Sequence, residues 1–211
     1  VTTTPKVHAL LALFMFQAAR LSARCDHRGE LLLLADQDRS LWDKSLLASG
    51  MEHFRRSAHG DELSDYHIEA EIAALHALAA SYESTDWHRI LECYERLQKL
   101  HFSVVAELNK IVVIEMIHGE QAALTALEHL ESEHRLDSFN LFHITKAHFL
   151  AKIGSTKAAL ASYERALTEV VDLDGVELSA RARPGGGPES TEARAALLTG
   201  VDEVFLRTPR L

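Results

Sequence analysis

The sequence is poor in the residues that cross-link or interrupt small domains. It has 2 cysteines, 4 prolines and 10 glycines among 211 residues. Cys25 and Cys93 lie far apart in the sequence, which excludes a disulfide framework or a cysteine zinc site and fits a reducing cytoplasm. The scarcity of proline and glycine, together with abundant alanine and leucine, favours helices over sheets. We therefore expect an all-α protein of the cytoplasm.

Positive charge and long apolar runs are also scarce. The chain has 31 acidic and 22 basic residues, with a formal net charge of −9. An acidic surface repels phosphate, so we expect no direct binding of nucleic acid, and basic protein surfaces are the more plausible partners. No run approaches the ~18 apolar residues needed to span a bilayer. The short apolar run at 9–16 continues as a helix pattern, and we interpret it as a core helix rather than a signal peptide.

The sequence contains no recognisable arrangement of catalytic residues. It has no glycine-rich phosphate loop, no nucleophile elbow and no identifiable pair of catalytic carboxylates. The 13 histidines invite a metal or acid–base hypothesis, but none is paired at the spacing of a helical zinc motif. We expect no enzyme, no cofactor and no metal; an enzyme or small-molecule sensor that uses the histidines is the competing hypothesis.

Apolar residues recur at three- and four-residue spacing along most of the chain, which predicts amphipathic helices. Residues 25–38 interrupt this pattern, and we expect an irregular insertion or a small hairpin there. The sequence predicts about nine helices, at 6–24, 40–60, 64–79, 85–97, 104–117, 121–133, 137–153, 154–167 and 190–206.

The helix pattern repeats along the chain. Leu91, Leu124 and Leu160 align at offsets of 33 and 36 residues, close to the period of about 34 residues in tetratricopeptide (TPR) arrays. Residues 154–167, GSTKAALASYERAL, resemble the second helix of one such unit. We predict a TPR-like helical-repeat solenoid over 1–171, a flexible Pro/Gly linker over 172–189 and a capping helix over 190–211.

The densest polar and aromatic cluster is 36–43, DQDRSLWD. One interpretation is structural: Asp38 or Ser40 caps a helix and Trp42 lies in the core. The other is a recognition loop that offers Gln37, Arg39 and Trp42 to a partner, so that Arg39→Ala weakens binding and leaves the melting temperature nearly unchanged.

Two further positions have the same ambiguity. Asp86 before Trp87 is either a cap and an apolar anchor or part of a binding surface. Asn109 within an apolar helix either ties neighbouring helices together, which we favour, or faces a ligand. The residues that we predict to form or support a partner surface are Asp36, Gln37, Asp38, Arg39, Trp42, Asp86, Trp87 and Asn109.

Several segments match a known family in order. These segments are VHALLALF (7–14), GELLLLADQDRSLWD (29–43), EIAALHA (71–77), STDW (84–87), VVAELNKIVV (104–113) and 154–167. Together they resemble the C-terminal, TPR-like extension of bacterial extracytoplasmic-function (ECF) sigma factors. The extension usually begins upstream of Val1, and the sigma regions that bind core polymerase and promoters are absent from this chain.

The resemblance implies an accessory domain that supports or controls sigma activity through protein contacts. We therefore expect a non-enzymatic regulatory domain that acts in transcription initiation by contacting its own sigma core, RNA polymerase or a signalling protein. The alternative is a free-standing TPR-like scaffold that binds a peptide or signalling partner in its concave groove. A helical-repeat face is a generic binding surface, so the fold does not choose between these functions.

Overall fold

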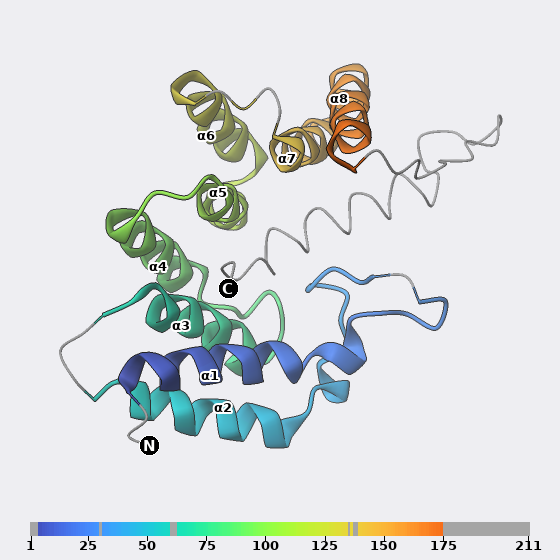
Figure 1. Ribbon diagram of the computed structural model, residues 1–211. Coiled ribbons are helices and arrows are strands. Elements are labelled where there is room, and N and C mark those ends of the chain that lie inside the picture. The colour runs from blue at the N-terminus through green and yellow to red at the C-terminus, as the bar shows by residue number, and fades with distance from the viewer. Residues whose placement is uncertain (1–3, 30, 60–62, 135, 137–138, 175–211) are drawn as a thin grey trace. The chain divides into compact units, whose positions relative to one another are not determined.

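The computed structural model describes residues 4–29, 31–59, 63–134, 136 and 139–174, and these residues are predominantly helical (Figure 1). The α-helices are α1 (Pro5–Ala18), α2 (Lys44–Ser57), α3 (Asp65–Leu78), α4 (Trp87–Leu100), α5 (Val104–His118), α6 (Glu120–Glu133), α7 (Asn140–Lys152) and α8 (Thr156–Asp174). Two short 3-10 helices, η1 (Leu21–Ala23) and η2 (Arg39–Leu41), lie between α1 and α2. The predicted all-α, helical-repeat fold class is confirmed.

The helix ends follow local chemistry. Pro5 begins α1 behind the cap residue Thr4, where its missing N–H costs nothing. The side chain of Asp86 accepts a hydrogen bond from the backbone N–H of Arg89, 3.0 Å away, and so begins α4. Gly119 and Gly154 separate α5 from α6 and α7 from α8 with φ angles of +84° and +79°, a conformation that favours glycine.

The predicted insertion is present and short. An isolated antiparallel bridge joins Cys25 to Leu31, and the described residues contain no longer β-ladder. The first predicted helix ends earlier than expected, at Ala18, and continues as η1. The second begins later, at Lys44, because Asp43 rather than Ser40 caps it. Within the described residues, no helix has the length and apolar character needed to cross a membrane.

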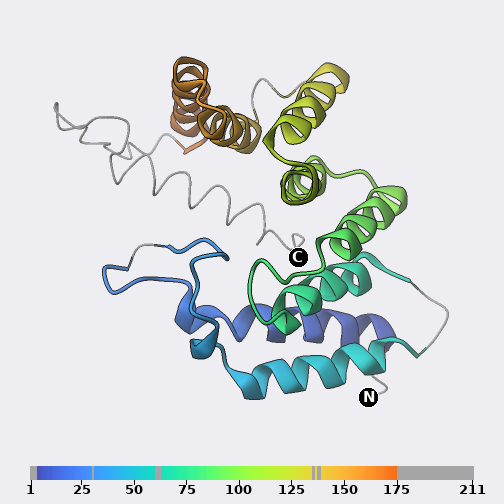
Figure 2. The same ribbon diagram turned by 180° about the vertical axis from the view of Figure 1, so that it is seen from behind.

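The described residues fall into two compact units, 4–113 and 114–174. In the first unit, α1 packs against both α2 and α3, and α3 packs against α4 (Figures 1 and 2). The core of α1, α2 and α3 consists of Ala12, Leu13, Phe16, Ala70, Ala73 and Ala74, with Leu47, Met51 and Phe54 against them. Small alanines on α3 let α1 approach closely.

In the second unit, α7 packs against α6 and α8. An ion pair joins Lys152 at the end of α7 to the buried carboxylate of Glu115 in α5. Ala159 and Ala166 of α8 are buried, whereas the neighbouring apolar residues Leu160 and Leu167 are exposed. The contact with α7 is narrower than the apolar face of α8. From residue 175 onward, the predicted linker and capping helix lie outside the described residues.

Candidate functional site

Two aspartates fix the backbone of the predicted recognition loop. Asp38 caps η2 by accepting a hydrogen bond from the N–H of Ser40, at 2.8 Å. Asp43 caps α2 by accepting from the N–H groups of Ser45 and Leu46, at 2.8 and 3.0 Å. Because each cap satisfies donors that have no partner within their helix, the 38–46 segment has a defined local structure.

Gln37 holds the insertion against the end of α1. Its side chain is only 6% exposed. The amide oxygen accepts a hydrogen bond from Nε of Arg20, at 3.2 Å, and the amide nitrogen donates to the carbonyl of Leu32, at 3.2 Å. Both hydrogen bonds are internal, so the structure places Gln37 beneath the loop rather than on its outer face.

Arg39 connects the loop to the end of α3. Its Nη1 donates to the carbonyls of His76 and Ala79, at 2.7 and 3.0 Å. These carbonyls carry the partial negative charge of a helix C-terminus, which a guanidinium stabilises. The same guanidinium lies over the ring of Trp42, 4.6 Å from its centroid, and Arg20 lies 5.6 Å from that centroid. Trp42 itself is 4% exposed.

Trp87 occupies a second buried aromatic position beside this loop. Its ring makes edge-on contacts with Tyr82, at a centroid distance of 4.9 Å, and with His76, at 5.4 Å. Tyr82 also packs on the cluster that contains Trp42. The 36–43 loop and the 79–86 loop are therefore neighbours, joined by Arg39 and by a shared aromatic cluster.

The exposed residues of these two loops are mostly acidic. Asp36, Asp38, Glu83 and Asp86 are all exposed, and we call them the acidic rim. Hydrogen bonds from Ser40 lower the pKa of Asp38. A hydrogen bond from its own backbone N–H, then one from Ser81, lower the pKa of Glu83, and Arg39 adds a smaller effect. These lowered pKa values favour the charged carboxylates of Asp38 and Glu83.

Apart from Arg39, which is partly buried, the predicted partner residues of these two loops divide into two groups. Asp36, Asp38 and Asp86 face solvent, and their role in binding stays a prediction. Gln37, Trp42 and Trp87 are buried and can act only by supporting the rim. Arg20, His76 and Tyr82 complete this support but were missed from the sequence, since they lie far along the chain from the residues that they contact and no local pattern marks them.

Asn109 belongs to a different part of the first unit. It is buried in α5, and its side chain hydrogen-bonds to the phenol of Tyr94 in α4. Burial is the largest cause that raises the pKa of Tyr94, which keeps the phenol neutral. This contact fits the interpretation that Asn109 ties neighbouring helices together.

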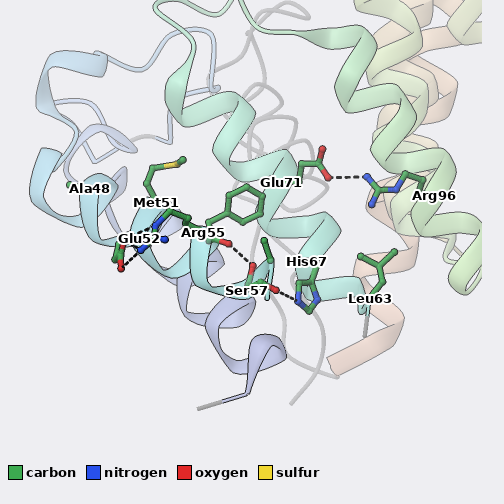
Figure 3. Close-up of a pocket in the computed structure, with 11 residues that line it drawn as sticks. Ala48, Met51, Glu52, Arg55, Ser57, Leu63, His67, Glu71 and Arg96 are labelled. Atoms are coloured by element: carbon green, nitrogen blue, oxygen red, sulfur yellow. Dashed lines mark hydrogen bonds and ion pairs between the residues drawn. The ribbon is translucent and has the colours of Figure 1, made fainter. Parts of the chain in front are cut away.

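A pocket of about 650 Å³ lies elsewhere on the first unit, between α2, the start of α3 and Arg96 of α4 (Figure 3). Its apolar wall consists of Ala48, Met51, Phe54, Ala58 and Leu63. Its charged residues pair with one another: Glu52 with Arg55 at 3.0 Å, and Glu71 with Arg96 at 2.9 Å. These ion pairs balance the charge beside the apolar wall of the pocket.

Hydrogen bonds at both ring nitrogens hold His67 in place at the pocket. Its Nδ1 accepts a hydrogen bond from the N–H of Ser64, at 3.1 Å, and its Nε2 is 3.2 Å from the carbonyl of Ser57, to which it donates. Both ring nitrogens are occupied in joining the end of α2 to the start of α3. Among the described residues, no three His, Cys, Asp or Glu side chains lie close enough to hold a metal ion.

Comparisons with known proteins cover part of the chain. Residues 1–58 match the model of a family of unknown function, DUF6596. The chain is also similar to an uncharacterized protein of Rhizobium meliloti (strain 1021), with 34% identity over 163 residues. That stretch is 77% of this chain and 38% of the relative, so the chain spans less than two fifths of the length of this curated relative. No solved structure matches the chain.

Proposed function

We propose that this chain is a non-enzymatic regulatory domain of an ECF sigma factor. It acts in the cytoplasm, in transcription initiation, by contacting its sigma core or RNA polymerase, and it needs no cofactor. The proposal rests on the family resemblance of the sequence. The structural observation that supports it is the acidic rim. Two neighbouring loops carry the rim, and buried polar and aromatic side chains hold these loops in place.

The rim suits a basic protein partner for two physical reasons. Its carboxylates are part of the chain's net charge of −9, so the long-range field attracts positive surfaces and speeds association. The loops are also held in place before binding, by the caps at Asp38 and Asp86 and by the bonds of Arg39. A surface that is ordered in advance loses less conformational entropy when it binds.

The contacts of the site support a binding role rather than a catalytic one. The polar side chains that the two loops bring together cap helices or satisfy backbone carbonyls, as Asp38 and Arg39 do. Such groups are already engaged and are not poised to exchange protons with a substrate.

Calorimetry tests the proposal. The titration partner is the polypeptide encoded directly upstream of Val1 in the same reading frame, expressed separately, and each titration is run at low and high salt. We expect binding that weakens with salt. The variants Asp36→Asn, Asp38→Asn and Asp86→Asn should weaken binding further, because asparagine preserves a helix cap but removes the charge.

The matched control is Glu95→Gln, an exposed carboxylate on α4 outside the rim, which should bind like the parent chain. Salt-dependent binding that the three rim variants leave unchanged would remove the rim from the proposal. If neither the upstream polypeptide nor RNA polymerase binds the parent chain, the proposed function is wrong.

The pocket favours one alternative, a free-standing scaffold that binds a peptide or signalling partner. Its apolar wall at Met51, Phe54 and Leu63 could hold an apolar side chain. The gene distinguishes the two functions. A start codon beside Val1 would support the scaffold, and an upstream sigma region in frame would support the regulatory domain.

A further inference from the structure

Helix α1 exposes large apolar side chains on one side. Val7 is 43% exposed, Phe14 is 47% exposed and Leu21, in η1, is 61% exposed. The opposite side of α1 packs on α2 and α3. A helix that is apolar all round is normally buried on every side. The exposed side of α1 is therefore a candidate interface.

The exposed residues of α1 follow the spacing of a helix–helix seam. Val7, Leu11, Phe14, Ala18 and Leu21 alternate in steps of four and three residues, and we call them the α1 stripe. Leu11 and Ala18 are partly buried, and they fill the spaces between the three exposed side chains. Alternating steps of four and three are the pattern by which one α-helix packs along another. The spacing of this stripe therefore suits packing against another α-helix.

The stripe leads to the acidic rim. Beyond Leu21, the hydroxyl of Ser22 donates a hydrogen bond to the carbonyl of Leu41, at 2.7 Å. Leu41 is also exposed, and it lies three residues after Asp38 of the rim. The end of the stripe at Leu21 therefore adjoins the segment that carries Asp38. Charge complementarity calls for basic residues at that end of the partner helix.

A second copy of this chain fits the stripe less well than another partner does. Each copy carries a net charge of −9, and like charges oppose association. The relative from Rhizobium meliloti extends well beyond the matched 163 residues, which are 38% of its length. In the proposed sigma factor, the sigma regions precede Val1. A short connection to α1 would give them a high effective concentration at the stripe.

We infer that the α1 stripe docks an amphipathic α-helix with basic flanks, supplied by the polypeptide that precedes Val1. This inference rests on the proposed function and adds to it the surface and the kind of element that bind. Apolar contacts along the stripe supply affinity, and the acidic rim fixes the direction of the bound helix.

The test uses the same separately expressed upstream polypeptide, titrated into the parent chain and three variants. Phe14→Glu and Val7→Glu place a charge in the stripe and should each weaken binding roughly tenfold or more. Neither should lower the melting temperature, because both side chains are about half exposed, and a glutamate at position 7 lies in the first turn of α1, where it favours the helix dipole.

Phe102→Glu is the matched control, since Phe102 is 50% exposed but lies in the connection between α4 and α5. It should bind like the parent chain. Parent-like binding by both stripe variants would overturn the inference and leave the proposed function intact. No binding of the upstream polypeptide by the parent chain would also overturn the inference, whereas the proposed function would fall only if RNA polymerase did not bind either. A dimer of the parent chain in sedimentation that Phe14→Glu abolishes would assign the stripe to a second copy instead.

Discussion

The guanidinium of Arg39 lies 4.6 Å from the ring centroid of Trp42 and covers its indole. The same guanidinium donates to two carbonyls at the end of α3. One side chain therefore joins the loop after the insertion to a helix about 40 residues further along the chain. The acidic rim depends on this connection for its position, which makes Arg39 a structural residue with a functional consequence.

Arg39→Ala should destabilise the protein. The variant loses two hydrogen bonds from a charged donor and a cation–π contact, which together contribute about 2 kcal/mol. The sequence alone predicted a nearly unchanged melting temperature for this variant, whereas the contacts of Arg39 predict a lower one. Urea denaturation measures the loss. Arg55→Ala, which removes only an exposed pair with Glu52, is the control and should change stability by less than about 1 kcal/mol. Equal effects of the two variants would contradict the structural role.

Gly50→Ala should also destabilise the protein, although alanine favours helices by about 1 kcal/mol. An added Cβ would lie 2.9 Å from Cε1 of Phe16 and 3.3 Å from Cβ of Met15. Phe16 is fully buried, so its ring cannot move aside without disturbing the core of α1 and α3. We expect a net loss of about 1–3 kcal/mol in the free energy of unfolding. Ser49→Ala in the same helix should be neutral or stabilising, and a stabilised Gly50→Ala would refute the close packing.

His76 should make the protein sensitive to acid. Burial, followed by the charges of Arg20 and Arg39, lowers the pKa of His76 to about 3, whereas an unfolded histidine titrates near ~6.5. Between these values the unfolded chain binds a proton that the folded protein excludes. The stability contributed by neutral His76 is complete above about pH 6.5 and falls below it, by up to ~1.4 kcal/mol per pH unit.

Urea unfolding at pH 7 and pH 5 checks this dependence. His76→Gln should lose less stability between the two pH values than the parent chain does, because one titrating group is gone. His88→Gln, at an exposed position, should keep the parent slope. If the slopes of all three proteins coincide, His76 does not titrate differently in the folded and unfolded states.

Glu69 should act in the opposite direction. Burial, followed by the charge of Asp65 one turn earlier, raises the pKa of Glu69 to about 7. Its Oε2 is buried and has no hydrogen-bond partner among the described residues. The folded protein therefore retains a proton at Glu69 that the unfolded chain releases near pH ~4.3. Stability from this group is present below that pH and is lost as the pH rises through 7.

Glu69→Gln should stabilise the protein at pH 8 on the order of 2 kcal/mol, because glutamine resembles the protonated acid and carries no charge. At pH 4 the variant should match the parent chain. Thermal denaturation at both pH values measures the difference, with Glu95→Gln as the exposed control. A stabilisation that is equal at both pH values would point to packing rather than to titration.

The helices could be located from the sequence because their ends depend on near neighbours. Asp86 caps α4 by accepting a hydrogen bond from the N–H of Arg89, three residues away. Gly119 and Gly154 adopt positive φ angles within single turns. Apolar periodicity between such signals was enough to place α3 to α7 within a few residues, whereas α8 continues to Asp174, beyond its predicted end at residue 167. It failed at 18–44, where the helix begins at Lys44 behind the cap residue Asp43 and not at Ser40, since several residues in that stretch could serve equally well as caps.

By itself, the sequence determined the all-α class, the acidic charge and the place of the insertion, because composition and local spacing control these properties. Only the tertiary structure decided which side chains of the 36–43 loop are buried. Gln37 and Trp42 are covered through contacts with Arg20, and Arg39 is engaged by carbonyls at the end of α3. The exposure of Val7 and Phe14 on α1 was settled in the same way, since burial depends on which helices pack against a face.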